Sequence, residues 1–384
     1  MSFTSRPNIP GFIKPFLRLV HYRNERKKFV REFAIRKQQN IYLNKNYQKD
    51  TSHLIIFFVP GSDWATGKDV ISGGTMSIVS ICQETVALKE VHQAATIMCT
   101  MNEDHLLLKH EKFENSTMVF RFSQLKKYFT HLSSILIHIP EFMASRFQEN
   151  LSTGDLIWLQ KIPLIHLNVM NQNIKLMPEP VILNSVKKIT SRITITTAHT
   201  QYCTPHYRQY YGVPLHKLSV WISPEQYRYT LWNDKESLLV VSPDPHSMKE
   251  EVLKMFAAIP GLTVQIIQNL TYQEYKKLIS RAKWALTFGE GLDGYFIEPV
   301  FSGAIAFAVY NEDFFTPDFK ELYTVYESIE VLKKEIQSAM KALDHPTDFV
   351  YYQKQQFDLC AQYYSQAQYS KNIAAFYKGE YTYA

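Results

Sequence analysis

Residues 288–298 read Phe288-Gly-Glu-Gly-Leu-Asp-Gly-Tyr-Phe-Ile-Glu298, a stretch with three glycines and two glutamates eight positions apart. The apolar run from Trp284 to Phe288 leads into it, and a Ser-Gly turn then leads to a second apolar run, Ala304 to Val309. Short apolar runs bounded by glycine are typical of buried strands. The stretch therefore predicts a strand, a glycine loop, a helix that begins near Leu292, and another strand.

Glycine is scarce in the rest of the chain. Only 13 of the 384 residues are glycine, about half of the usual share of about 7%. Eight of the 13 fall in two windows, which hold Gly61, Gly67, Gly73 and Gly74, and then Gly289, Gly291, Gly294 and Gly303. Glycine lets the backbone turn sharply or approach a ligand closely. Both windows are therefore the first places to expect a binding site.

Apolar runs alternate with helical patterns along most of the chain. Leu54 to Val59 predicts a buried strand, and the first glycine window joins it to a helix that reaches about Val86. Further strands are expected at Ala94–Thr100, Met118–Phe122, Ile135–Ile139, Ile165–Met170, Arg192–Thr197, Ser237–Val241 and Thr263–Ile267. This alternation predicts an α/β fold in which two Rossmann-like domains face each other across a cleft.

We expect four parts along the chain. Residues 1–50 form a basic amphipathic helical segment, 51–213 an N-terminal Rossmann-like domain, and 214–348 a C-terminal Rossmann-like domain. A C-terminal helical stretch, rich in Tyr, Phe and Gln, covers 349–384. The boundary between the two large domains is placed at a turn near residues 211–215.

The positive charge of the chain lies at one end. Residues 1–50 hold 12 Lys and Arg against three acidic residues, a net charge of +9, whereas residues 51–384 hold 30 against 33. In residues 10–45 this charge accompanies apolar residues at helical spacing. Such a segment fits either an anionic membrane surface or a first helix that packs on the domain with a solvated charged face. No nucleic-acid-binding motif accompanies the charge, so nucleic acid is not an expected partner.

Several other classes of protein are excluded by the sequence. The apolar runs are far shorter than the roughly 20 residues that span a bilayer, and the basic N-terminus has no continuous apolar signal core. We therefore expect a cytoplasmic protein, peripheral on the inner face of the cytoplasmic membrane if the basic segment binds lipid. The four cysteines lack metal-ligand spacing, so no metal site is expected. Neither a phosphate loop nor a G-x-S-x-G elbow occurs.

The second glycine window resembles the E-x7-E signature of retaining GT-B glycosyltransferases, especially those of glycosyltransferase family 4. In that family one Glu lies in a glycine loop after a strand, a second lies on the next helix, and a small-Gly turn leads into a buried strand. Glu290, Glu298 and Ser302-Gly303-Ala304-Ile305-Ala306 match these elements in order. Gly73-Gly74 resembles the loop after the first core strand. The resemblance implies an acceptor domain at 51–213 and a nucleotide-sugar domain at 214–348.

The resemblance also implies roles for individual residues. Glu290 would orient the donor sugar and Glu298 would bind the ribose. The expected donor-binding residues are Gly73, Gly74, Lys249, Gly291, Leu292, Asp293, Gly294 and Glu298. The family often carries a His after a strand of its N-terminal domain, which makes His138 the second expected catalytic residue beside Glu290. A structural histidine is the alternative at that position.

The sequence departs from the family at the diphosphate site. The family usually places an Arg and a Lys just after the first strand of its C-terminal domain, whereas residues 241–249 offer Lys249 and no Arg. Three other cations are rivals for this role: Arg208, Arg281 and Lys283. The cation that would bind the diphosphate therefore stays open.

The resemblance implies a retaining, metal-independent hexosyltransferase. It would move a sugar from a nucleotide-diphosphate donor to a glycan or lipid-linked acceptor, in the synthesis of surface polysaccharide or glycoconjugate. The nucleotide-sugar is a co-substrate, and no cofactor is expected. Two alternatives remain: a sugar-nucleotide epimerase of the same fold, and a non-catalytic GT-B partner subunit, which the missing Arg favours. The sequence does not determine the donor sugar, the base, the acceptor or the linkage.

Overall fold

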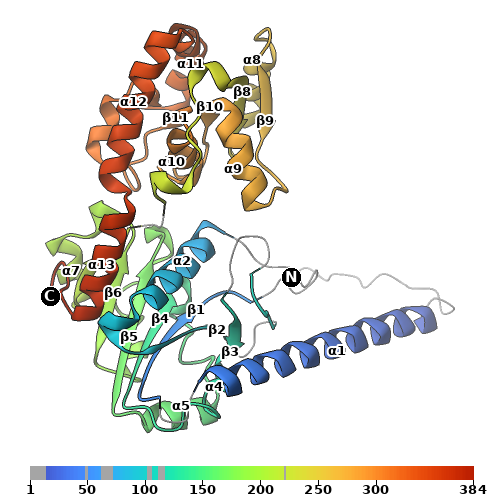
Figure 1. The fold of residues 1–384 in the computed structure, drawn as a ribbon, viewed down its shortest axis with the longest axis vertical. Helices are drawn as coiled ribbons and strands as arrows, with labels where there is room; N and C mark the ends of the chain where they lie inside the picture. The colour runs from blue at the N-terminus through green and yellow to red at the C-terminus, as the bar shows by residue number, and fades with distance from the viewer. Residues whose placement is uncertain (1–13, 48–50, 62–71, 102–105, 111–116, 220–221) are drawn as a thin grey trace, which may run out of the picture.

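The computed structural model describes residues 14–47, 51–61, 72–101, 106–110, 117–219 and 222–384. These residues form two α/β domains, each built on one parallel sheet, which Figure 1 shows one above the other. The α/β class and the two parallel sheets that the alternating pattern predicts are confirmed. Gly67 of the first glycine window lies outside the described residues.

The N-terminal sheet has seven strands in the order β3-β2-β1-β4-β5-β6-β7. Its strands are β1 His53–Phe58, β2 Ala95–Thr100, β3 Val119–Arg121, β4 Ser134–Pro140, β5 Leu164–Asn171, β6 Ile193–Thr197 and β7 Leu215–Lys217. All neighbouring strands are parallel. The strand order reverses between β1 and β4, and ligands of such sheets bind beyond the carboxyl ends of the strands at this switch point.

The C-terminal sheet has five parallel strands in the order β12-β11-β10-β8-β9. Its strands are β8 Glu236–Val241, β9 Thr263–Ile266, β10 Ala282–Leu286, β11 Ile305–Val309 and β12 Val325–Tyr326. Here the order reverses between β8 and β10. The second glycine window follows β10 directly, so it lies at the switch point of this domain.

Helices flank both sheets. The first set is α1 Lys14–Asn46, α2 Gly73–Ala87, α3 Lys89–His92, α4 Phe122–Leu125, α5 Thr153–Gln160, α6 Leu183–Lys187 and α7 Pro205–Tyr211. The second set is α8 Lys249–Ala257, α9 Tyr272–Arg281, α10 Gly294–Phe301, α11 Ile329–Leu343, α12 Pro346–Tyr363 and α13 Gln366–Lys378. Short 3-10 helices are η1 Glu141–Met143, η2 Ile174–Leu176, η3 Thr200–Tyr202, η4 Pro224–Gln226, η5 Trp232–Asp234 and η6 Pro317–Glu321.

The domain boundary lies later than the sequence predicts. β7 pairs with β6, so the expected boundary at residues 213 and 214 falls before the last strand of the first sheet. The expected C-terminal stretch 349–384 is not one unit, because its helices pack on different domains. α12 packs on α10 and α11 of the C-terminal domain, whereas α13 packs on α2 and α3 of the N-terminal domain, as Figure 1 shows. The apolar side chains of α13, such as Ile373, are buried in the N-terminal core.

α1 is one helix of 33 residues, where the sequence allows one helix or two. Near its end Leu43 is buried in the N-terminal core, and Gln39 Nε2 donates to the carbonyl of Val119 at 2.8 Å. Before this anchor the helix projects from the domain (Figure 1), and Phe29 and Phe33 are 70% and 63% exposed. The described helices include none that is long and apolar enough to cross a membrane.

Candidate active site

The loops after the carboxyl ends of both sheets meet between the two domains. Asn173, which follows β5, donates from Nδ2 to Oε1 of Glu290, which follows β10, at 2.8 Å. Asp313, which follows β11, accepts a hydrogen bond from the hydroxyl of Tyr202 at 2.9 Å. Lys175 Nζ lies 3.4 Å from the same Asp313 carboxylate. We call this region, residues 171–175 and 199–202 facing 287–298 and 311–315, the interdomain site.

The second glycine window folds as predicted, as a loop between a strand and a helix. α10 begins at Gly294, two residues later than expected. Gly291 and Gly303 have φ of +87° and +88°, a conformation that favours glycine. A Cβ at Gly291 would collide with the ring of Phe315, and one at Gly303 with the carbonyl of Thr230. Both glycines are therefore required by the fold itself.

The two glutamates of the E-x7-E stretch lie on either side of the start of α10. Glu290 is half-buried in the loop, and burial raises the pKa of its carboxyl group. Glu298 is only 6% exposed, and its Oε1 lies against Gly294, the first residue of α10. Burial raises the pKa of Glu298 to about 8, and the hydroxyl of Tyr272 donates to its Oε2 at 3.4 Å. The carboxylate of Glu290 therefore faces the other domain, whereas that of Glu298 is buried against the start of α10.

Asp293 caps α10 with its own carboxylate. Oδ1 accepts from the amide of Phe296 at 3.2 Å, and Oδ2 accepts from the hydroxyl of Thr287 at 3.1 Å. Burial, Asp244 and Glu290 raise the pKa of Asp293 to about 7. One of the amides at the start of α10 is therefore bound by Asp293 and not available to a ligand. Leu292 is buried in the C-terminal core.

The start of α2 is more open. The hydroxyl of Ser72 caps the helix by accepting from the amide of Thr75 at 3.2 Å. Among the described residues, no acceptor is found for the amides of Gly73 and Gly74. A Cβ at Gly73 would have nothing within 4 Å, so packing of the described chain does not require glycine there. Amides without a partner at a helix start favour an anion, and the phosphate contact at Gly73 and Gly74 stays a prediction.

Lys249 holds the loop that follows β8. Its Nζ donates to the carbonyls of Ser242 at 2.6 Å and Asp244 at 2.8 Å, and burial lowers the pKa of its ammonium group. The three rival cations are engaged elsewhere, in the contacts Arg208–Ala384, Arg281–Glu236 and Lys283–Asp344. The structure therefore does not bring these rivals to the interdomain site, and Lys249 has at most one donor left for a phosphate.

His138 is not at the interdomain site. It is 1% exposed in β4, stacks on Phe57 with ring centroids 4.3 Å apart, and burial lowers its pKa well below the usual value. Nδ1 lies 3.0 Å from Asn168 Nδ2, and Nε2 lies 3.2 Å from the hydroxyl of Tyr377 on α13. The expected catalytic role is corrected because α13 covers this face of the sheet. His138 fits the structural alternative.

Glu141, which directly follows β4, is a residue of the site that was not predicted from the sequence. Its carboxyl group is 3% exposed and accepts hydrogen bonds from the amides of Gln172 at 3.3 Å and Asn173 at 3.2 Å. Burial raises the pKa of Glu141 to about 7. The signal in the sequence was a carboxylate at the carboxyl end of a predicted strand beside the switch point.

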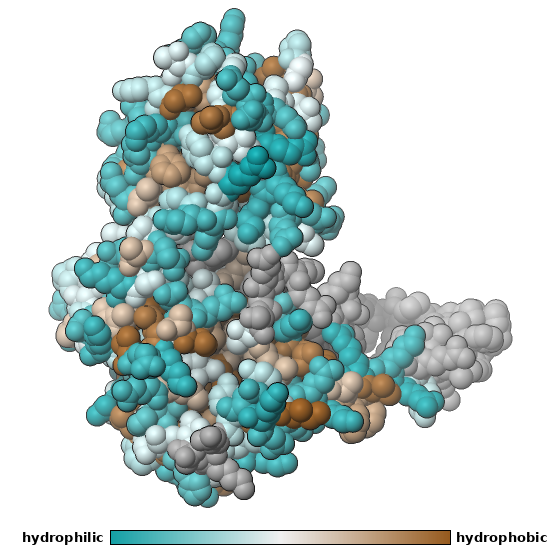
Figure 2. All heavy atoms as spheres, viewed as in Figure 1, coloured by the Kyte–Doolittle hydropathy of each residue, from teal (hydrophilic) through white to brown (hydrophobic). Residues whose placement is uncertain are grey.

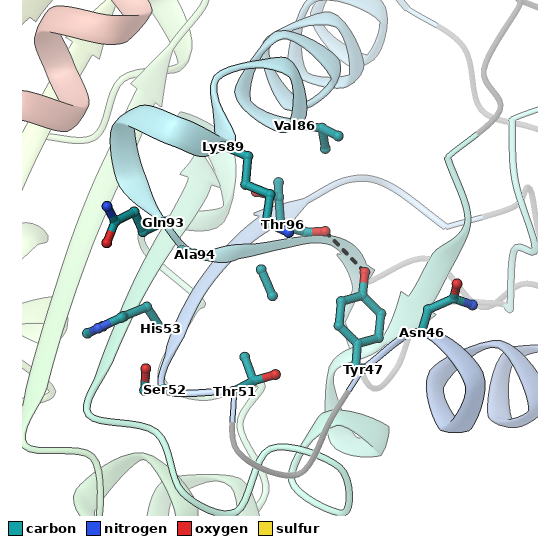
Figure 3. Close-up of a pocket in the computed structure, with 11 residues that line it drawn as sticks. Asn46, Tyr47, Thr51, Ser52, His53, Val86, Lys89, Gln93, Ala94 and Thr96 are labelled. Carbon is teal, nitrogen blue, oxygen red and sulfur yellow. Dashed lines mark hydrogen bonds between the residues drawn. The ribbon is translucent and has the colours of Figure 1, made fainter.

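A cavity of about 580 Å³ lies in the N-terminal domain, and Figure 3 draws the residues that line it. Its lining includes Tyr47, His53 and Lys89, and the hydroxyl of Tyr47 donates to the carbonyl of Thr96 at 3.4 Å. These residues lie near the amino ends of β1 and β2. Because parallel sheets place ligands beyond the carboxyl ends, this cavity is not part of the interdomain site.

No model of a known protein family matches the sequence, and no curated protein matches it either. Among solved structures, sucrose-phosphate synthase from Thermosynechococcus elongatus is similar over 85% of this chain and 99% of its own, with a TM-score of 0.57 and 10% identity. HepE from Anabaena, solved in complex with UDP-glucose, is similar over 85% and 99%, with a TM-score of 0.53 and 9% identity. The chain has the GT-B fold.

The GT-B fold confirms the predicted arrangement of two Rossmann-like domains. At identities of about 10% the likeness shows the fold and not the reaction, so the chemistry must be argued from the residues of the interdomain site. Within the described ranges, no group of three or more His, Cys, Asp or Glu side chains is placed to hold a metal ion. All four cysteines are buried thiols.

Proposed function

We propose that the protein is a retaining, metal-independent glycosyltransferase, which moves a sugar from a nucleotide-diphosphate donor to a glycan or lipid-linked acceptor. The observation that carries this proposal is the place of Glu290. It lies at the switch point of the C-terminal domain of a GT-B fold and faces the other domain through Asn173. The complex of HepE with UDP-glucose supports a nucleoside diphosphate sugar as the donor.

The reaction breaks the bond between the anomeric carbon of the sugar and the diphosphate oxygen. Positive charge then develops on the sugar ring and negative charge on the leaving diphosphate. Glu290 would face the sugar, Glu298 the ribose, and the free amides of Gly73 and Gly74 the diphosphate. The acceptor hydroxyl attacks the face that the diphosphate leaves, and its proton passes to the departing phosphate oxygen. The nucleotide-sugar is a co-substrate in this scheme.

One observation favours a second candidate, the non-catalytic GT-B partner subunit. The interdomain region is rich in carboxyl groups, because Glu141 and Asp244 lie near Glu290 and Asp293. Burial raises the pKa values of Glu141, Glu290 and Asp293, and the charge of Asp244 adds to this rise at Glu290 and Asp293. Lys249 is bound to two carbonyls. A diphosphate brings further negative charge to this region, so nucleotide binding decides between the two candidates.

The deciding experiment is a thermal shift assay with UDP, GDP, dTDP, ADP and CMP. A ligand that binds the native state raises the melting temperature as its concentration exceeds the Kd. We expect a rise with one nucleotide, lost in Glu298→Gln and kept in the control Glu380→Gln, whose side chain is exposed. A folded protein that responds to no nucleotide would instead support the non-catalytic subunit. A product assay with the nucleotide-sugar then separates transfer from epimerisation, which needs no acceptor.

We also propose that α1 brings the protein to an anionic membrane surface, where lipid-linked acceptors of surface polysaccharide or glycoconjugate synthesis reside. Its exposed side chains combine aromatic rings with cations, namely Tyr22, Phe29, Phe33, Arg26, Lys27, Arg31, Arg36 and Lys37. Aromatic residues insert at the lipid headgroup level, and cations are attracted to anionic lipids. Charge complementarity supports the inner face of the cytoplasmic membrane as the location.

A further inference from the structure

A hydrogen bond joins the two domains at the carboxylate that the proposed function places beside the donor sugar. Asn173 Nδ2 donates to Glu290 Oε1 at 2.8 Å, between residues 117 positions apart in the sequence. Both side chains are partly buried. A charged group that is already oriented before reaction stabilises developing charge without the cost of reorganisation. The direction of the Glu290 carboxylate is therefore set, in part, by the N-terminal domain.

Asn173 is itself held in one orientation. Its Oδ1 accepts from the amide of Lys175 at 3.0 Å, which caps η2. Because the amide oxygen has this partner, the amide nitrogen is the atom that faces Glu290. The backbone amide of Asn173 donates to Oε1 of Glu141 at 3.2 Å, so both the backbone and the side chain of Asn173 are fixed.

Glu141 supports the turn from the core of the N-terminal domain. Its two oxygens accept from the amides of Gln172 and Asn173, and its side chain is 3% exposed. Burying a carboxyl group is costly, and a well-packed apolar side chain often gives equal or greater stability. What the carboxyl group adds here is a fixed path for the backbone of residues 172–173. That path presents Asn173 to the C-terminal domain.

We propose that Asn173 is a positioning residue for Glu290, and that Glu141 holds Asn173 in place. The inference rests on the proposed role of Glu290 beside the donor sugar. Glu290 is then correctly oriented when the two domains meet, so transfer requires the closed arrangement. A donor bound to the C-terminal domain alone would meet a carboxylate whose direction is not fixed, and such a state would react slowly.

The pKa of Glu290 depends on the charges around it and on its hydrogen bond with Asn173. Lys175 opposes the rise in the pKa of Glu290, whereas Asp244 and burial raise it. The charge of Glu290 in turn contributes to the raised pKa values of Glu141 and Asp293. The amide of Asn173 donates to the carboxylate and therefore favours its ionised form. Without this donor the pKa of Glu290 should rise further.

The test compares Asn173→Ala, Asn173→Asp and the control Asn184→Ala, which changes an exposed residue of α6. Asn173→Asp keeps the shape of the side chain and removes the donor. With the donor sugar found by the thermal shift assay, we expect kcat to fall about tenfold or more in both Asn173 variants, because a hydrogen bond to a charged group is lost. KM should stay within about threefold. The acid limb of the pH–rate profile should move to higher pH.

A purely structural role for Asn173 would lower stability without moving the acid limb. If both Asn173 variants keep the kcat and pH profile of the unaltered protein, the proposal is wrong. Glu141→Gln should act in the same direction, with faster hydrogen exchange of the amides of residues 172 and 173, because one acceptor oxygen is replaced by a donor. Unchanged exchange in this variant would remove Glu141 from the proposal.

A second readout does not depend on activity. The carboxyl 13C shifts of labelled glutamate report the pKa of Glu290, which is assigned with Glu290→Gln. We expect this pKa to rise in Asn173→Ala and to stay unchanged in Asn184→Ala. If the unaltered protein transfers no sugar, the proposed function fails, and this titration still tests the contact. An unchanged pKa in Asn173→Ala would overturn the inference in either case.

Discussion

A side chain at Gly303 would collide with the carbonyl of Thr230, and the backbone there has φ of +88°. Among the described residues nothing lies within 4 Å of a Cβ at Gly73, and φ there is not positive. Glycine is therefore present at these two positions for two different reasons. Gly303 is needed by the turn that leads into β11, whereas at Gly73 no contact within the described part of the chain requires glycine.

This difference gives a prediction at the scale of single residues. Gly303→Ala should lower the free energy of unfolding by about 1–3 kcal/mol, because alanine is strained in that conformation. Gly73→Ala should leave it unchanged or raise it by about 0.5–1 kcal/mol, because alanine favours the helix. Urea denaturation measures both. If a phosphate approaches the backbone at Gly73, the same variant also binds the nucleotide more weakly. Equal destabilisation in the two variants would contradict this account.

α13 shows how one element joins the domains. It follows α12, which belongs to the C-terminal domain, yet Tyr369 and Ile373 are buried in the core beside α2. Its Tyr377 hydroxyl lies 2.8 Å from the hydroxyl of Thr85 on α2. After α13, Tyr383 forms a bridge with Leu215 of β7. α13 and the residues that follow it therefore stabilise the N-terminal domain.

At the scale of this element, Ile373→Ala should lower the free energy of unfolding by about 2–4 kcal/mol, because it leaves a cavity in the core. Hydrogen exchange should accelerate in α2 more than in α9. The control Val350→Ala changes a side chain of α12 that is 50% exposed, and it should stay within about 0.5 kcal/mol. Faster exchange confined to the C-terminal domain would show that α13 does not stabilise the N-terminal core.

The whole molecule carries its charge unevenly. Residues 1–50 have a net charge of +9 and residues 51–384 a net charge of −3. α1 carries most of this excess, and Figure 1 shows that it projects from the N-terminal domain. On the face drawn in Figure 2 the rest of the surface is mostly hydrophilic. An anionic surface therefore attracts one end of the molecule and weakly repels the remainder.

The prediction at this scale concerns vesicles of phosphatidylcholine with and without 30 mol% phosphatidylglycerol. The unaltered protein should sediment with the anionic vesicles and remain in solution with neutral ones, because attraction to anionic lipid amounts to about 1 kcal/mol per cation. Arg26→Glu combined with Arg31→Glu should abolish sedimentation. The control, Lys187→Glu with Lys341→Glu, changes exposed lysines elsewhere and should have no effect. Equal binding to neutral vesicles would argue against the proposed charge attraction.

The sequence by itself determined most of the strands and the place of the second glycine window. The strand expected at Ile135–Ile139 is β4 Ser134–Pro140, and Glu290 and Glu298 lie on the predicted loop and helix. These features can be predicted because the hydropathy pattern and the positions of glycine determine local structure over a few residues. Lys249 was also correctly placed after β8, although its bonds to two carbonyls were not predictable.

Only the tertiary structure decided which residues meet at the interdomain site. A local pattern could not show that α13 covers His138, or that Asn173, held by Glu141, reaches Glu290. The same holds for β7, which joins the first sheet beyond the expected boundary. The physical reason is that a periodic pattern indicates which side of an element is buried, whereas the partner that buries it comes from segments far away in the sequence.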